Sequence, residues 1–209
     1  MAIVVKKDGT VVVKAPLHTK VTRINAFVNA HADWIKAKQS ELADKFSKYE
    51  PIQLENNEIV YYMGNPLYIK RIKARSIDME EDTGILYIPL TASPDTLISW
   101  YKKQALPVIT DLVEEYARLM GLEGKYSSVK LSIAKSKWGS CSYDNKLLFS
   151  WRLIMCPTEV IEYVVVHELA HIIEKNHSKA FWNEVKKVLP DYREHRKWLK
   201  DNSGLMDLI

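Results

Sequence analysis

The chain of 209 residues has only two cysteines, Cys141 and Cys156, too few for a framework of several disulfide bonds. It has no apolar run near the roughly 18 residues that a membrane-spanning helix needs. The apolar run at its start is too short for a signal peptide. Internal repeats, low-complexity tracts and long blocks of one charge are also missing. These absences predict a globular cytoplasmic protein with reduced thiols and no membrane partner.

The composition is that of an ordinary folded domain, with 47% hydrophobic and 27% charged residues. A chain of this length can bury one sizeable core or two small ones. The formal net charge of +4 and the pI near 8.8 are mildly basic. Because the lysines and arginines are spread along the chain, solvated helix faces explain them better than a nucleic-acid surface does. Nucleic acid is therefore a weakly supported partner, and the oligomeric state is left open.

Residues 1–92 predict a β-rich region with one helix. The pair Asp8-Gly9 between two runs of β-forming residues indicates a hairpin. From Thr22, apolar residues at helical spacing predict a helix that continues until Pro51 and covers a sheet. Further strands are expected over residues 59–72, broken at Gly64, and over residues 85–90.

A second region is expected over residues 93–209. It begins with a helix that Ser93 caps and that ends at Gly121, and Pro107 should kink or divide it. Two later runs, residues 129–136 and 147–154, alternate apolar and polar side chains and predict two strands that pair antiparallel.

A short segment lies between these two strands, in which Trp138 is followed by the small residues Gly139, Ser140 and Cys141. Small residues leave backbone groups open to close approach. One interpretation is an unpaired strand edge that holds an extended peptide by main-chain hydrogen bonds. The other is a tight bend with Trp138 packed in the core, and the sequence favours neither.

The motif His167-Glu168-Leu169-Ala170-His171 is the most informative part of the chain. On a helix, residues four apart share a face and lie about 6 Å apart along the axis, so the two imidazoles can hold one ion. In H-E-x-x-H sites the histidine pair binds zinc and the glutamate is the general base. The motif predicts one Zn²⁺ per chain, with Glu168 taking a proton from an activated water.

His177 is the expected third ligand. Uninterrupted helix would place it roughly 15 Å from His167 along the axis, too far to share an ion. The helix must therefore end near Lys175-Asn176, and Asn tolerates the left-handed conformation that ends helices. Ser178 can cap the next helix, so the chain should reverse with His177 at the corner.

Three alternatives to His177 as third ligand remain: Glu184, Glu194 and Cys141. If no metal binds, His167 and His171 would instead be ordinary core histidines. The apolar run of residues 160–166 predicts a buried helix, opened by Pro157 in its first turn.

Four further residues are candidates for supporting roles: Glu174, Tyr192, Arg152 and His195. The Glu174 carboxylate could orient a ligand imidazole, since such rings usually donate their other N–H to an acceptor. The other three carry donors that could stabilise a developing oxyanion. Packing or surface pairing is the competing interpretation for each of them.

With these segments in view, the chain resembles the YgjP-like metallopeptidases, relatives of the SprT-like and WLM zinc proteases. The resemblance is carried by residues 137–142, 151–154, 163–171 and 176–182 and extends in weaker form over nearly the full length. It implies zinc on His167, His171 and His177, with Glu168 as base. It also implies an α+β fold, in which a zincin-like catalytic domain, with a small antiparallel-edged sheet packed on the HExxH helix, follows the N-terminal β-rich region.

The leading prediction is thus a zinc metallopeptidase of the endopeptidase type, with a peptide or protein as substrate. Two alternatives are a zinc-stabilised module that binds protein or nucleic acid with little turnover, and a zinc hydrolase of non-peptide amides. A structural zinc is normally closed by four protein ligands, whereas this site offers three and a glutamate. That difference favours catalysis.

Overall fold

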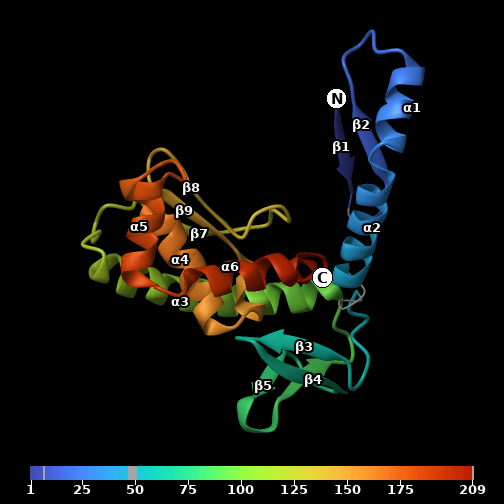
Figure 1. Ribbon diagram of the computed structural model, residues 1–209. Coiled ribbons are helices and arrows are strands. Elements are labelled where there is room, and N and C mark those ends of the chain that lie inside the picture. The colour runs from blue at the N-terminus through green and yellow to red at the C-terminus, as the bar shows by residue number, and fades with distance from the viewer. Residues whose placement is uncertain (7, 47–50, 209) are drawn as a thin grey trace. The chain divides into compact units, whose positions relative to one another are not determined.

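The computed structural model describes residues 1–6, 8–46 and 51–208. Its backbone contacts divide the chain into two compact units, Met1–Glu50 and Pro51–Ile209. The mixture of helices and small sheets confirms the predicted α+β class (Figure 1). Within the described ranges, no helix has both the length and the apolar character needed to cross a bilayer.

The first unit begins with the predicted hairpin. Strands β1 (Ala2–Val5) and β2 (Val11–Lys14) pair antiparallel. In the turn, the Asp8 carboxylate accepts a hydrogen bond of 2.9 Å from the Thr10 N–H, and Gly9 has a φ of +78° that glycine adopts without strain. The local turn chemistry therefore fixes this hairpin.

Two helices follow where the sequence predicted one: α1 (Val21–Asn29) and α2 (Ala32–Phe46). The break has a local cause, because the His31 ring is hydrogen-bonded through Nδ1 to the Phe27 carbonyl at 2.8 Å. The His31 N–H then turns to the Val28 carbonyl three residues back. The Gln39 amide donates to the Gly9 carbonyl at 2.8 Å and fastens α2 to the hairpin. The expected helix end before Pro51 lies partly outside the described residues.

The second unit starts with a four-stranded sheet in the order β3-β4-β6-β5. Its strands are β3 (Ile59–Tyr62), β4 (Asn65–Ile72), β5 (Asp78–Glu80) and β6 (Ile85–Pro89). The break expected at Gly64 is the turn of a hairpin in which β3 and β4 pair antiparallel, and Gly64 has a φ of +81°. A Cβ at Gly64 would lie 2.9 Å from the Pro157 Cα, so this turn packs directly against the start of the HExxH helix.

The long helix α3 (Pro94–Leu119) starts at a Ser93–Thr96 capping box, as the sequence predicted. It runs through Pro107 and is not divided there. The buried Tyr101 hydroxyl donates to the Tyr61 carbonyl at 2.8 Å and joins α3 to β3.

The boundary expected near residue 93 therefore falls inside the larger compact unit. Besides the Tyr101 contact, the Met63 N–H donates to the Ile154 carbonyl at 2.7 Å. Strands β3 to β6 share a core with the elements that follow them, and the chain divides into its two compact units between residues 50 and 51.

A three-stranded sheet in the order β7-β9-β8 lies beside the HExxH helix. Its strands are β7 (Ser128–Ser132), β8 (Gly139–Cys141) and β9 (Lys146–Ser150). The prediction that β7 and β9 pair antiparallel was wrong, because they pair parallel. The intervening segment turns back through Asn145, with a φ of +56°, so that β8 occupies one edge of β9 as its antiparallel partner. Strand β7 takes the other edge.

The remaining elements are helical: η2 (Trp151–Met155), α4 (Thr158–Ile173), α5 (Lys179–Val188), α6 (Tyr192–Asp201) and η3 (Ser203–Asp207). Helix α4 carries the HExxH motif and contacts α3, α5, α6 and β8 (Figure 1). The apolar residues before the motif are buried, as predicted. This packing holds the motif rigidly in the second unit.

Candidate metal centre

Three histidines converge at the end of α4. His167 and His171 lie on one face of the helix, with ring centroids 5.0 Å apart. His177 reaches them from the following turn, with its centroid 4.9 Å from His167 and 4.7 Å from His171. One ring nitrogen of each lies within 4.8 Å of the others. The geometry is that of three ligand atoms around one point.

The chain reversal that brings in His177 occurs where the sequence predicted it, but through another residue. Helix α4 ends at Ile173, and Glu174 is extended with φ −128° and ψ 110°. Asn176 is not left-handed, so the expected role of this residue was wrong. Ser178 caps α5 as predicted, and its hydroxyl accepts the Phe181 N–H at 3.2 Å.

Lys175 holds this turn against the sheet. Its ammonium donates to the Asn145 side-chain oxygen at 2.6 Å and to the Ser142 carbonyl at 3.3 Å. Both acceptors belong to the turn between β8 and β9. The turn that carries His177 and the strand that borders the cleft are therefore tied together.

The pKa values of two of the imidazoles are shifted in the direction that favours binding of a cation. Burial, with the neighbouring His171 and His177, lowers the pKa of His167 to about 3. Burial also lowers the pKa of His171. Both shifts favour the uncharged ring, and a neutral imidazole nitrogen is a common zinc ligand.

A backbone group orients His171. Its Nδ1 donates to the Glu174 carbonyl oxygen at 3.1 Å, which leaves Nε2 for an ion. The sequence suggested the Glu174 carboxylate for such a role, whereas the structure gives this contact to the main chain. The helix end thus places His177 and orients His171 at once.

The Phe181 ring packs against all three histidine rings. It is fully buried, and its ring centroid lies 4.9, 4.5 and 4.8 Å from those of His167, His171 and His177. Trp182 stacks on His177 with 5.7 Å between centroids and an interplanar angle of 25°. These aromatic residues limit the rotation of all three imidazoles.

Glu168 lies beside the histidines and is only 5% exposed. Burial raises the pKa of its carboxyl to about 8, although the Lys137 charge and a hydrogen bond from the Cys141 N–H act in the opposite direction. Its Oε2 has no hydrogen-bond partner among the described residues. An unpaired buried carboxylate oxygen is costly and is typical of functional sites.

This burial predicts how the metal-free protein responds to pH. In the folded state the Glu168 carboxyl keeps its proton up to about pH 8, but in the unfolded chain it ionises near 4.5. Ionisation therefore favours unfolding increasingly from pH 4.5 to 8. At pH 8 the free energy of unfolding of metal-free Glu168→Gln should be about 2–4 kcal/mol larger than that of the wild type. The reason is that the acid constant of Glu168 differs between the folded and unfolded states, and each tenfold difference is worth about 1.4 kcal/mol. Denaturant unfolding at pH 5 and pH 8 tests this, and an equal difference at both values would contradict it.

Strand β8 presents a free edge at the cleft. The Ser150 N–H donates to the Trp138 carbonyl at 2.8 Å, and the Ser142 N–H donates to the Lys146 carbonyl at 3.0 Å. Because bonding alternates along an antiparallel strand, the backbone groups of Gly139 and Cys141 face away from β9. The described residues include no strand that pairs with this edge. The edge is therefore open except where the Cys141 N–H meets Glu168.

Gly139 is required for the close approach of β8 to α4. A Cβ at this position would lie 2.6 Å from Oε1 and 2.7 Å from Cγ of Glu168. Gly139→Ala should therefore displace the carboxylate and lower kcat/KM by about 100-fold, the effect of misplacing a catalytic group by about 1 Å. Peptide-cleavage kinetics test this, with zinc content as a check on the fold and Ser140→Ala as the control. Wild-type activity in Gly139→Ala would contradict this account of the glycine.

The cleft around these groups has a volume of about 310 Å³. It is lined by Lys137, Gly139, Ser140, Cys141, His167, Glu168, His171, Lys175 and His177. The sequence analysis did not identify Lys137 and Lys175 as residues of the site, although each lies next to a segment that it did single out. Cys141 borders the cleft but is not one of the three clustered ligands, and neither Glu184 nor Glu194 belongs to that cluster.

The three suggested oxyanion-stabilising residues do not line this cleft. Arg152 is buried, with its guanidinium 4.3 Å from the centroid of the Trp151 ring. Tyr192 is buried and stacks on Trp182 at 5.1 Å between centroids. His195 lies with its centroid 6.4 Å from that of Tyr163. These three ring contacts lie outside the cleft.

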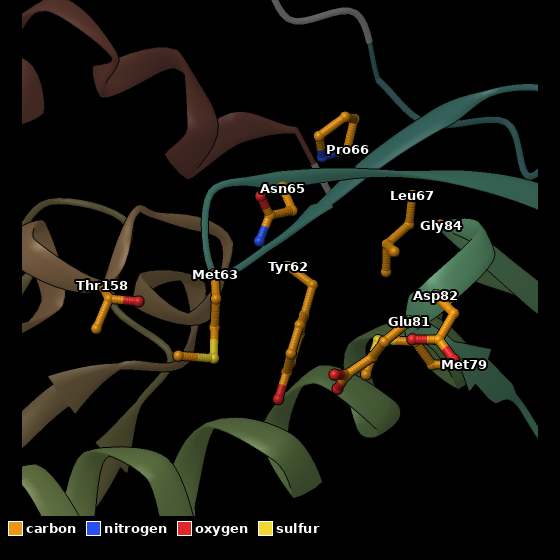
Figure 2. A pocket seen from close by; sticks show the side chains of 10 residues that line it. All are labelled: Tyr62, Met63, Asn65, Pro66, Leu67, Met79, Glu81, Asp82, Gly84 and Thr158. Carbon is orange, nitrogen blue, oxygen red and sulfur yellow. The ribbon is translucent and has the colours of Figure 1, made fainter.

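A separate pocket of about 480 Å³ lies at the other end of α4 (Figure 2). Tyr62, Glu81 and Asp82 border it, and Thr158 lies on its α4 side. Thr158 precedes His167 by nine residues, which places it about 13 Å away along the helix and on the opposite face. This pocket is therefore not continuous with the histidine cluster, and no three clustered ligands border it in the described structure.

Comparison with known proteins gives one family match and similarity to two solved structures. The family model described as YgjP-like, metallopeptidase domain, matches residues 1–202. No curated protein gives a significant match. The zymogen of Pyrococcus abyssi abylysin, a metallopeptidase, is 24% identical, with a TM-score of 0.41 over 44% of this chain and 92% of its own. The zymogen of Methanocaldococcus jannaschii jannalysin, also a metallopeptidase, is 22% identical, with a TM-score of 0.39 over 44% and 93%.

Both TM-scores are below 0.5, so the family assignment does not depend on these two structures. It depends on the family match, which spans almost the whole chain. The protein belongs to the YgjP-like metallopeptidase family.

Proposed function

We propose that the protein is a zinc-dependent endopeptidase that holds its metal on His167, His171 and His177. The observation that carries this proposal is the convergence of three ligand nitrogens within 4.8 Å beside a buried carboxylate. Imidazole nitrogens suit zinc, and a three-ligand site leaves a coordination position for a reacting molecule. The substrate is a peptide or protein strand that adds to the open edge of β8.

In the proposed reaction, each residue of the cleft has a separate role. When bound, Zn²⁺ supplies an acidified water and polarises the peptide carbonyl. Glu168 accepts the proton of the attacking water and delivers it to the leaving amine. Burial makes the Glu168 carboxylate more basic, and the positive charge of a bound Zn²⁺ would favour the ionised form that this transfer needs. Lys137 lines the same cleft, and in this proposal its ammonium stabilises negative charge on the carbonyl oxygen.

The ligand set argues against a zinc-stabilised binding module. Such a module would close its zinc with a fourth protein ligand, for which Cys141 is the nearest candidate. Among the described residues, the group that could hold a metal ion consists of the three histidines and does not include Cys141. The Cys141 N–H is instead hydrogen-bonded to Glu168, a contact that organises the base.

Metal removal tests the proposal. A chelator should abolish cleavage of a proteome-derived peptide library, and Zn²⁺ should restore it. Mg²⁺ should not, because it demands octahedral oxygen ligands and a cluster of imidazoles holds it poorly. Mass spectrometry of the products would show new peptide amino termini and so distinguish a peptidase from a hydrolase of other amides. Undiminished cleavage by metal-free protein would refute the proposal.

A further inference from the structure

A second, smaller pocket opens beside the cleft on the side of α6. It has a volume of about 240 Å³. Its walls are mostly apolar or aromatic: Trp138, Tyr163, Val164 and Leu199. Tyr163, Val164 and Leu199 are 4%, 3% and 8% exposed, so their side chains belong to the core while one surface of each borders the pocket.

The pocket and the cleft share their central residues. Lys137, Gly139, His167 and Glu168 line both. The reacting groups therefore stand at the boundary between the two spaces. Gly139 has no side chain, and the Glu168 carboxyl group packs against it, with Oε1 2.6 Å from the position that a Cβ would take, so these two residues lie between the cleft and the pocket. A molecule bound at Glu168 therefore lies next to a residue that borders both spaces.

The size of the pocket limits what can enter it. Sites for whole small-molecule ligands usually measure about 300–1,000 Å³. A space of about 240 Å³ is below that range and suits one side chain of a larger molecule. An extended peptide points successive side chains to opposite sides, so a strand along β8 directs one toward the cleft and the next toward the pocket.

The chemistry of the walls selects the side chain. Aromatic and aliphatic surfaces favour an apolar group, because a charged one would lose its hydration there. Lys137 also lines the pocket, and its positive charge further disfavours lysine and arginine. Leucine, methionine and phenylalanine combine sufficient size with an apolar surface.

We infer that this pocket binds an apolar side chain of the substrate at one of the two residues flanking the scissile bond. The inference rests on the proposed peptidase function and adds to it a class of substrate. Leu199 and Val164 then determine how large a side chain is accepted.

Binding of zinc-chelating peptides tests the inference without turnover. Zinc-loaded protein would be titrated calorimetrically with dipeptide hydroxamates that carry Gly, Ala, Leu or Phe beside the chelating group. The wild type should bind the Leu compound about 10- to 100-fold more tightly than the Gly compound, as expected for a few buried methylenes. Leu199→Phe, which fills the pocket, should reduce this ratio to about 2 or less. Val164→Ala, which enlarges it, should shift the preference toward Phe.

Val185→Ala is the matched control, because Val185 is also fully buried but borders neither space. It should leave the ratio of Leu to Gly affinities unchanged. A ratio near 1 in the wild type, or one that Leu199→Phe does not alter, overturns the inference.

Cleavage of peptides with the same substitutions separates this inference from the proposed function. Peptides cleaved without any side-chain preference would refute the pocket and leave the peptidase standing. Selective hydroxamate binding without cleavage of any peptide would refute the peptidase and support the pocket. Failure of every hydroxamate to bind the zinc-loaded protein would overturn both.

Discussion

Glu168→Gln is expected to bind about one zinc per chain and to cleave peptides about 10²- to 10⁴-fold more slowly than the wild type. The amide has nearly the shape of the carboxylate, which matters because Gly139 leaves no room for a larger group. All three histidines remain, so metal affinity should be retained. Only the capacity to accept a proton is lost.

The control for this variant is Glu159→Gln, the same substitution on an exposed residue of the same helix. It should retain wild-type cleavage and zinc content. Initial rates at several peptide concentrations would separate kcat from KM, and the loss in Glu168→Gln should fall on kcat. Full activity of Glu168→Gln would eliminate Glu168 as the base.

His177→Ala is expected to weaken zinc binding by more than about 100-fold, the upper end of what loss of a supporting partner costs a metal site. Cleavage at limiting zinc should fall in parallel. The physical reason is that His177 supplies one of three nitrogens, and the two residues on α4 cannot close a site by themselves. Metal analysis after dialysis against a zinc buffer measures the effect.

His195→Ala is the matched control for this histidine. Its ring packs near Tyr163 and lies outside the cluster, so zinc affinity should stay at the wild-type level. A His177→Ala protein that binds zinc as tightly as the wild type would refute the ligand set.

The histidine cluster could be predicted because its determinants are local. The spacing of His167 and His171 fixes a shared helix face, and His177 can reach them only if the helix ends. The reversal was therefore a necessary consequence of the hypothesis, and the structure shows it. The residue that ends the helix was less predictable, since an extended Glu174 carries no sequence signal comparable to that of a left-handed Asn or Gly.

Strand direction was not accessible from the pattern of side chains. Alternation of apolar and polar residues shows which side chains share a face, and it is the same in parallel and antiparallel strands. The antiparallel neighbour of β9 is β8, because the turn at Asn145 folds β8 back onto one edge of β9. An unpaired edge that holds a peptide was one of two interpretations of the small residues after Trp138. The structure shows β8 at the edge of its sheet, and peptide binding there stays a prediction.

The remaining features of the site join residues far apart in sequence. Leu199 on α6 borders the same pocket as Trp138, and Lys175 binds the turn at Asn145. The contact that orients His171 comes from a main-chain carbonyl, which every residue type possesses. Such contacts follow from packing in three dimensions and leave no local sequence signal. For the same reason the sequence suggested Tyr192, Arg152 and His195 as oxyanion-stabilising residues, whereas the structure has Lys137 in the cleft and none of these three.

The central claim is a three-histidine zinc site with a fourth position open to the reaction. X-ray absorption at the zinc edge of the zinc-loaded protein tests it most directly, because nitrogen and sulfur ligands differ in distance and scattering. The account predicts three imidazole nitrogens at about 2.0–2.1 Å and one exchangeable oxygen. A sulfur at about 2.3 Å, which would place Cys141 on the metal, would contradict it and indicate a closed structural site.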